Sequence, residues 1–220
     1  MKKVPTGSEV LDELLNGGYP ANRITMIYGP AASGKTTACL QLCVNNSLKR
    51  SKTLFLDTEK GFSVERLQQI SSRRKCLNDV LIVNVGSFQE LIKKVKKSYS
   101  LLENAGVNIM VIDTIGKHYR VSLNENPQAA NKKMVELMRL LHDITTKREL
   151  ATVLITNQVY TDIENDRISN VGGKMIRNFS TCVIELKKDN SKRIAKVVKY
   201  DEAELKELEF LITNIGISKK

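Results

Sequence analysis

The chain of 220 residues contains no tryptophan, only two histidines and only four cysteines. The cysteines form no C-x-x-C pair, and both histidines lie far from them in sequence. This scarcity disfavours a zinc site and a disulfide framework, which both need closely ordered ligands or pairs. We therefore expect small buried thiols in a reducing cell interior at Cys39, Cys43, Cys76 and Cys182.

Long apolar runs are missing as well. The first segment, MKKVPTGSEVLDELL, has two lysines but no continuous apolar stretch, which argues against a secretory signal. No segment approaches the length needed to cross a bilayer, so we expect a cytoplasmic protein that does not bind membranes. Linkers, repeats and low-complexity tracts are absent from the sequence. With 41% hydrophobic and 27% charged residues, residues 1–220 are expected to form one soluble domain.

Acidic charge is in deficit. Lysines and arginines number 35 against 24 aspartates and glutamates, and the formal net charge is +11. A basic surface attracts polyanions, and nucleic acid is the commonest polyanion inside cells. Excess lysine also improves solubility, and charge alone does not separate these two explanations.

Short apolar runs alternate with helical patterns along most of the chain. Apolar residues recur at 3.6-residue spacing between the runs, most clearly over residues 126–147. This alternation predicts an α/β fold with a mostly parallel twisted sheet flanked by helices. The runs that fit buried strands are ITMIY (24–28), TLFLD (53–57), VLIVNV (80–85), IMVID (109–113) and ATVLIT (151–156).

Both ends of the chain depart from this alternation. TGSEVLDELLNGG (6–18) predicts a short helix that Ser8 caps and that stops at the asparagine and glycines. Three apolar runs near the other end follow one another without helices, at 181–188, 194–200 and 208–213. KDNSKR (188–193) is typical of a hairpin turn. We therefore expect an antiparallel C-terminal hairpin extension of the same sheet.

A glycine-framed loop lies between the first of these strands and a helix. GPAASGKT (29–36) matches G-x-x-x-x-G-K-[ST], whose glycines let the backbone N–H groups point at phosphate oxygens. Lys35 would neutralise the β- and γ-phosphates, and Thr36 would bind Mg²⁺. A chance glycine-rich turn is the alternative. The predicted phosphate-binding residues are Gly29, Pro30, Ala31, Ala32, Ser33, Gly34, Lys35, Thr36 and Thr37.

Polar residues end three of the other predicted strands. Asp113 stands where a carboxylate would hold magnesium together with Thr36, although a strand-end aspartate also caps turns. Asp57 and Glu59 follow TLFL, and a glutamate there could orient water at the γ-phosphate. Asn157 and Gln158 follow VLIT, where an amide could sense the γ-phosphate.

At these positions the sequence resembles the RecA-like recombinases, in their archaeal and eukaryotic branch. DTEKGFSVERL and MVIDTIGKHYR are similar to two of its acidic strand ends, LITNQV to its γ-phosphate-sensing strand and VGGKMIRN to its GGHxxAH segment. TGSEVLDELLNGG resembles its opening segment and EFLITNIGI its closing strand. The matches stay in order across nearly the whole chain. They imply a RecA-type P-loop NTPase core that uses ATP and Mg²⁺.

The resemblance also implies roles for single residues. Glu59 would activate water, with Lys35 and Gln158 as further catalytic groups. Arg66 and Gln69 would lie near the adenine. Residues 115–123 would form a first DNA-binding loop and residues 160–173 a second, with Tyr119 and Tyr160 as the stacking candidates. The DNA-binding residues so implied are Tyr119, Arg120, Arg167, Lys174 and Arg177.

The last third of the sequence is rich in basic residues, which supports DNA binding through phosphates. Only Glu185 and Asp189 oppose them between residues 167 and 199, and a simple solvated face is the alternative. The basic residues are Arg167, Lys174, Arg177, Lys187, Lys188, Lys192, Arg193, Lys196 and Lys199.

The chain also departs from the family pattern. It begins at the core, so we expect no N-terminal helix-hairpin-helix domain and no polymerisation motif. Lys60 follows the predicted catalytic glutamate, and Lys174 and Asn178 replace the GGHxxAH histidines, which disfavours hydrolysis at a protomer interface. The resemblance is strongest to core-only archaeal paralogues of these recombinases.

Such a paralogue would be a nucleoid-associated accessory protein of homologous recombination and DNA repair. It would bind single-stranded or branched DNA without sequence preference, hydrolyse ATP weakly and perform no strand exchange. Its partners would be a RadA-type recombinase and a Holliday-junction resolvase. A RecA-fold signalling ATPase that does not act on DNA, and a full strand-exchange recombinase, are the alternatives. A P-loop kinase or GTPase lacks the support of any base-specifying motif.

Overall fold

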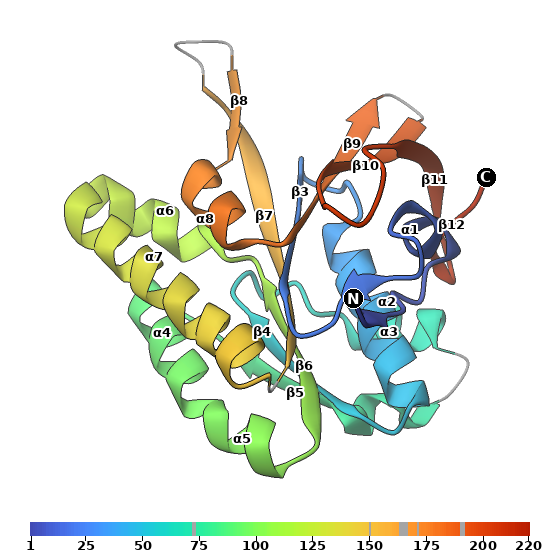
Figure 1. Cartoon of the computed structure of the whole chain (residues 1–220), viewed down its shortest axis with the longest axis horizontal. Helices are drawn as coiled ribbons and strands as arrows, with labels where there is room; N and C mark the ends of the chain where they lie inside the picture. Colours follow the sequence, from blue (N-terminus) through green and yellow to red (C-terminus); the bar gives the residue numbers. More distant parts are fainter. Residues whose placement is uncertain (72–73, 150, 163–166, 171, 190–191) are drawn as a thin grey trace.

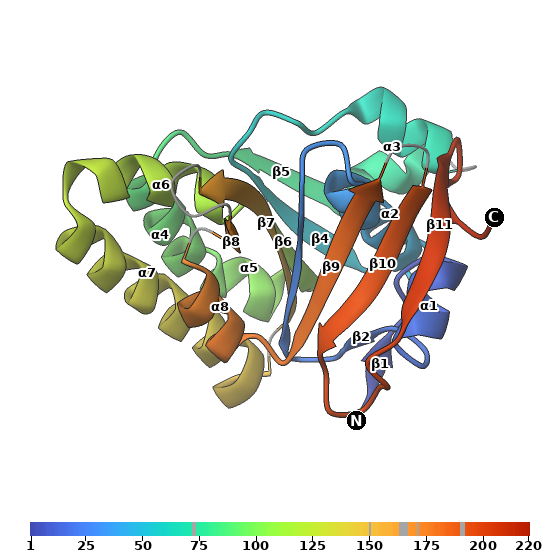
Figure 2. The same ribbon diagram turned by 90° about the horizontal axis from the view of Figure 1, so that it is seen from above.

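The computed structural model describes residues 1–71, 74–149, 151–162, 167–170, 172–189 and 192–220. A large sheet crosses the molecule and helices cover both of its faces (Figures 1 and 2). The parallel strands of its centre are β3 (Ile24–Gly29), β4 (Lys52–Asp57), β5 (Val80–Asn84), β6 (Val107–Asp113) and β7 (Thr152–Asp162). They pair in the order β3-β7-β6-β4-β5, and each of these pairings is parallel. All five strands predicted for the first three quarters of the chain are thus present.

Four strands extend the sheet beyond β3. β9 pairs with β3 in parallel, and each later strand then pairs antiparallel with the one before it, which confirms the predicted hairpin extension. Asp189 faces Lys192 at the end of the first hairpin, and residues 190–191 lie outside the described ones. The strands are β9 (Cys182–Asp189), β10 (Lys192–Lys199), β11 (Glu207–Thr213) and β12 (Gly216–Ser218).

Strand β7 is longer than its neighbours. Its pairing with β3 ends at Gln158 and its pairing with β6 at Ile155. From Val159 to Asp162 it pairs with the short strand β8 (Arg167–Asn170), and this hairpin rises above the sheet (Figure 1). A separate small sheet joins β1 (Lys3–Val4) to β2 (Tyr19–Pro20).

Two hydrophobic cores flank the sheet because successive strand residues face opposite sides. Along β6, Ile109 and Val111 belong to one core, and Met110 and Ile112 to the other. The first core lies under α1 (Glu9–Leu14), α2 (Lys35–Leu48), α3 (Val64–Ile70) and the 3₁₀ turn η1 (Arg74–Asp79). The second lies under α4 (Phe88–Lys97), α5 (Tyr99–Asn104), α6 (Gly116–Glu125), α7 (Pro127–His142) and α8 (Gly173–Phe179).

Helix α1 follows from its sequence. The Ser8 hydroxyl accepts a hydrogen bond from the Leu11 N–H at 3.4 Å, and the helix ends before Asn16, as predicted. The four cysteines are buried free thiols, which confirms the expectation that they pack as small residues. Within the described residues, no helix is both long and apolar enough to span a bilayer.

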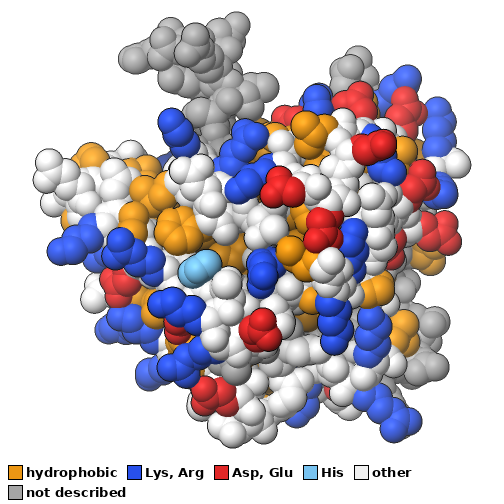
Figure 3. All heavy atoms as spheres, in the orientation of Figure 1, with side chains coloured by type: hydrophobic (Ala, Val, Ile, Leu, Met, Phe, Trp, Pro, Cys, Tyr) orange, Lys and Arg blue, Asp and Glu red, His pale blue; other side chains and the backbone are white. Residues whose placement is uncertain are grey.

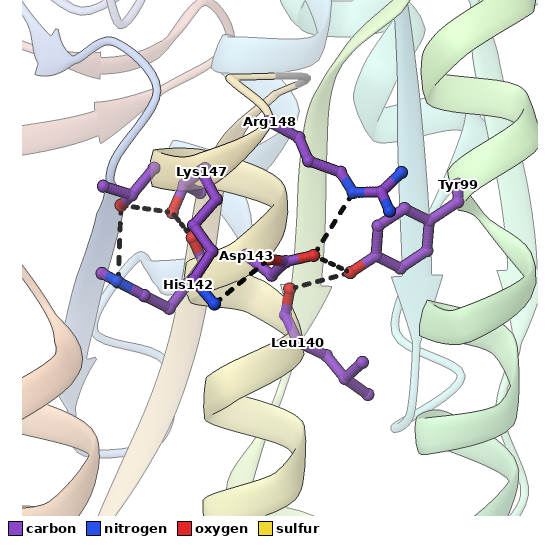
Figure 4. A network of polar contacts seen from close by, with 8 residues as sticks. Tyr99, Leu140, His142, Asp143, Lys147 and Arg148 are labelled. Carbon is purple, nitrogen blue, oxygen red and sulfur yellow. Dashed lines mark hydrogen bonds and ion pairs between the residues drawn. The ribbon is translucent and has the colours of Figure 1, made fainter.

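Helix α7 continues into a π-helical turn, η2 (Asp143–Lys147), where a carboxylate connects neighbouring helices (Figure 4). Asp143 Oδ2 accepts from the Tyr99 hydroxyl at 3.1 Å and pairs with Arg148 Nε at 3.4 Å. Lys147 Nζ lies 3.7 Å from Asp143 Oδ1. The network fixes the end of α7 against α5, on the side of the sheet away from the glycine-framed loop (Figure 1).

Candidate nucleotide-binding site

The glycine-framed loop connects β3 to α2 at the carboxyl end of the parallel strands, where α/β sheets hold their ligands. Ala32 and Gly34 have positive φ angles of 57° and 109°, and these turn the backbone into a curl. A Cβ atom at Gly29 would lie 2.2 Å from the Leu186 carbonyl oxygen on β9, so only glycine fits there. The loop is therefore packed closely against the strand extension.

A cavity of about 520 Å³ opens above this loop. The predicted residues from Ala31 to Thr37 line it, together with the predicted Glu59, Asp113 and Gln158. Thr114, Arg193 and Ile212 complete the lining, and none of them was predicted to contact the nucleotide. Residues from three separate strand ends thus meet around one space, as the parallel sheet requires.

Lys35 lies at the floor of the cavity and is almost fully buried. Its Nζ donates to the carbonyl oxygens of Gly29 at 2.9 Å and Pro30 at 2.6 Å. Burial lowers the pKa of Lys35, while the nearby carboxylates of Asp113 and Glu59 act to raise it. A phosphate oxygen would give this ammonium a charged acceptor in place of neutral carbonyls.

Asp113 forms the acidic part of the site and is only 4% exposed. One of its oxygens accepts from the Thr36 hydroxyl at 2.7 Å, and the other accepts from the Thr156 hydroxyl. Burial raises the pKa of Asp113, and these two hydrogen bonds oppose the rise. The predicted metal pair, Thr36 and Asp113, is therefore in contact, with the hard oxygen donors that Mg²⁺ prefers.

Glu59 and Gln158 also meet, although 99 residues separate them. Gln158 Nε2 donates to the two carboxylate oxygens of Glu59 at 2.8 and 3.1 Å, and the Thr114 hydroxyl donates at 3.2 Å. Asp57, the other candidate on this strand, instead accepts from the backbone N–H groups of residues 59, 61 and 62. Asp57 therefore shapes the loop, and Glu59 faces the cavity.

The residues fit a nucleotide with Mg²⁺. The Ser33 hydroxyl is buried in the loop and has no hydrogen-bond partner among the described residues, so one donor or acceptor position is left open. The loop N–H groups and Lys35 would hold phosphates, and Thr36 and Asp113 would hold the metal. Mg²⁺, when bound, would neutralise phosphate charge.

Arg66 and Gln69, predicted to lie near the adenine, are not part of the cavity lining. They are one turn apart on α3, where Arg66 donates to the Gln69 side-chain oxygen at 3.0 Å and to the Thr213 carbonyl at 2.6 Å. This second bond places them beside the end of β11, next to Ile212, which does line the cavity. Their contact with a base stays a prediction.

The segment predicted as a first DNA-binding loop, residues 115–123, is largely the helix α6. Tyr119 is only 2% exposed, its hydroxyl donates to Asn131 and its ring lies 5.6 Å from that of Phe88. The expectation that Tyr119 stacks on bases is therefore wrong, because the ring belongs to the core under α6. Arg120 is exposed on the same helix, and its contact with DNA stays a prediction.

The segment predicted as a second DNA-binding loop, residues 160–173, begins as the β7–β8 hairpin. The side chains of Tyr160 and Arg167 lie outside the described residues, as do residues 163–166 and 171. Lys174 and Arg177 are exposed on α8, which follows the hairpin. Their contact with DNA stays a prediction.

Basic side chains are spread over the face shown in Figure 3 among acidic and uncharged ones. Several basic residues of the last third have partners in the chain: Lys192 lies 3.3 Å from Glu209, Lys187 lies 3.8 Å from Glu185, and Lys199 donates to the Ser180 carbonyl at 2.7 Å. Arg193, grouped with them in the sequence, is half-buried and lines the nucleotide cavity.

Comparisons with known proteins agree with this geometry. The sequence model of the Rad51 family matches residues 1–220. The chain is 35% identical over 214 residues to the DNA repair and recombination protein RadB of Methanococcoides burtonii, covering 94% of this chain and 93% of that protein. It is 36% identical over 220 residues to the RadB of Methanoculleus marisnigri, covering 98% and 97%. A solved structure, described as the crystal structure of the RadB recombinase, superposes with a TM-score of 0.80 at 28% identity and 99% coverage of both chains.

Proposed function

This chain belongs to the Rad51 family, and from that premise we propose that it is an ATP-binding, DNA-binding accessory protein of homologous recombination and DNA repair. The observation that carries the proposal is the hydrogen bond between Glu59 and Gln158. It connects the group predicted to activate water with a residue of β7, the strand that continues into the β7–β8 hairpin. Nucleotide and DNA would thereby act on one structural element.

The nucleotide half rests on Lys35, Thr36 and Asp113. The curled loop would offer its N–H groups and Lys35 to the phosphates, and Thr36 and Asp113, which are hydrogen-bonded to each other, would hold Mg²⁺. Glu59 would accept a proton from a water whose oxygen bonds to the γ-phosphorus while the bond from that phosphorus to the ADP oxygen breaks, which is the reaction of an ATPase. Gln158 and Thr114 hold the Glu59 carboxylate in place, and the carboxylate keeps acceptor capacity for a water. The proposal of weak hydrolysis rests on the departures from the family pattern at Lys60, Lys174 and Asn178.

The DNA half rests on charge. Arg120 is exposed on α6, which contacts β7, and Lys174 and Arg177 are exposed on α8, which contacts β8. Such residues bind phosphates and carry no sequence information, which suits single-stranded or branched DNA of any sequence. We further propose a cytoplasmic, nucleoid-associated protein that works with a RadA-type recombinase and a Holliday-junction resolvase and performs no strand exchange itself.

A joint binding assay tests the proposal. Fluorescence anisotropy would follow single-stranded and branched DNA, each with no nucleotide, with Mg-ADP and with Mg-ATP, at several salt concentrations. We expect binding in at least one state, an affinity that depends on the nucleotide, and a steep fall with salt because phosphate contacts release counterions.

Other outcomes point to the two alternatives. ATP binding without any DNA binding would replace the proposal with a RecA-fold signalling ATPase. Efficient pairing and exchange of homologous strands by the protein alone would make it a full recombinase.

A further inference from the structure

Two residues of the cavity lining, Arg193 and Ile212, come from the antiparallel extension, and Arg193 is the charged one. It is the second residue of β10, opposite Lys188 on β9 and Phe210 on β11. The close approach of the loop to β9 at Leu186 brings this end of the extension beside the phosphate loop. The guanidinium of Arg193 thereby lies at the phosphate loop, although the loop begins far away in sequence, at Gly29.

The side chain of Arg193 is half-buried, and its Nε is fully buried without a hydrogen-bond partner among the described residues. The ion pairs within the described part of the chain do not include it either, while the neighbouring Lys192 is paired with Glu209. A buried guanidinium N–H without an acceptor is unfavourable, and arginine remains charged at all ordinary pH values. A ligand that supplies anionic oxygens in the cavity would satisfy it.

The alternation of β10 explains why this arginine faces inward. Ala195 and Val197, which share its side of the strand, are buried in the core under α1 and α2. Lys192 and Lys196 occupy the opposite set of positions. One strand thus directs an arginine to the nucleotide cavity and lysines away from it.

We propose that Arg193 is a phosphate ligand of the bound nucleotide, supplied by the same chain that carries the phosphate loop. The proposal rests on the nucleotide binding proposed above and adds a contact from the C-terminal extension. The planar guanidinium binds two phosphate oxygens at once, which Lys35, a point charge on the floor of the cavity, does not do. Phosphate would be held between the two cations.

The test measures equilibrium affinity. Isothermal titration or displacement of a fluorescent nucleotide would give dissociation constants for Mg-ATP, Mg-ADP and inorganic tripolyphosphate. The variants are Arg193→Gln, Arg193→Lys, the matched control Lys192→Gln on the same strand, and Lys35→Ala. Thermal melting without ligand would show that each variant is folded.

We expect Arg193→Gln to weaken ATP and tripolyphosphate by roughly ten- to a hundred-fold, the range of a hydrogen bond to a charged group. Arg193→Lys should recover part of the loss because it keeps the charge, and Lys192→Gln should bind as the wild type does.

Three results separate the possible failures. Unchanged affinity for Arg193→Gln, with loss of binding in Lys35→Ala, overturns the role of Arg193 and leaves the nucleotide site intact. Loss of ATP affinity without loss of tripolyphosphate affinity also overturns it, because the contact would then be to the nucleoside. Absence of ATP binding in the wild type overturns nucleotide binding itself.

Discussion

Two regions beside β7 use polar residues in opposite ways: an organised end at the nucleotide cavity and a charged end on α6 and α8. At the organised end, Thr156 and Gln158 of β7 are hydrogen-bonded to Asp113 and Glu59. At the charged end, the exposed Lys174 and Arg177 lie on α8, and Arg120 lies on α6. The first region is organised before any ligand arrives. The second relies on net positive charge, which tolerates many arrangements.

The largest effect is expected from Lys35→Ala, which removes the buried ammonium from the organised end. ATP affinity should fall by at least about 100-fold, because a charge-assisted contact to phosphate is lost in a partly buried site. Titration of ATP against the variant would measure the loss. Lys49→Ala, an exposed lysine at the end of the same helix, is the control and should bind normally. Equal affinity in both variants would remove Lys35 from the site.

Glu59→Gln should separate binding from turnover. The variant keeps the size of the side chain but cannot accept the proton of an attacking water, so ATP should still bind while hydrolysis falls by about 100-fold. Phosphate release under single-turnover conditions measures it. Glu65→Gln, on the exposed first turn of α3, is the matched control. Wild-type hydrolysis in Glu59→Gln would show that another group activates water.

Asp113→Asn should affect stability and metal binding in opposite directions. Because burial raises the pKa of Asp113 above its ordinary 3.8, the folded protein binds this proton more tightly than the unfolded chain does. The stability from this proton is present below the ordinary pKa and is lost as pH rises through the folded one. The asparagine variant has no carboxyl proton to lose, so its melting temperature should gain on that of the wild type as pH rises, and it should need more Mg²⁺ to bind ATP.

Thermal melts of the nucleotide-free proteins, from about pH 4 to about pH 7, test this sign. The advantage of the variant should grow with pH. A difference that stays constant, or that favours the wild type more as pH rises, would show that the Asp113 carboxylate is already ionised in the folded protein throughout this range.

The smallest effects are expected at the charged end. There the neighbours Arg120 and Tyr119 separate the effect of lost charge on DNA binding from the effect of lost packing on stability. Arg120→Gln should weaken DNA binding only a few-fold and lower the salt dependence by about one counterion, since it removes one phosphate contact. Tyr119→Phe should leave DNA affinity unchanged and lower stability by about 1 kcal/mol, because it removes the bond to Asn131. Salt titrations and melts of both variants measure this, and a DNA defect in Tyr119→Phe would contradict the burial argument.

The sequence predicted the organised end well, because regular spacing encodes it. Parallel strands bring their carboxyl ends to one edge, so Asp113, Glu59 and Gln158 were expected to converge and they do. The fold, the hairpin extension and the resemblance to archaeal relatives of the RecA-like recombinases are all confirmed. Thr156, in β7, and Thr114, directly after β6, were missed because a threonine in or beside a buried strand carries no signal of a polar role.

One error and one omission have physical causes that the sequence contains. The segment of Tyr119 resembles a DNA-binding loop of the family, whereas its ring fills the core between α6 and α7. Arg193 was not assigned to the nucleotide site. Its alternation with Ala195 and Val197 indicates the buried side of β10, and this signal was available in the sequence.

The length of β7 has a mechanical consequence. Gln158 is the last residue that β7 pairs with β3, and from Val159 onward its ladder runs with β8. The hairpin therefore begins one residue beyond Gln158, whose side chain is hydrogen-bonded to Glu59. A change in the direction of the hairpin strands would reach that residue along one continuous backbone.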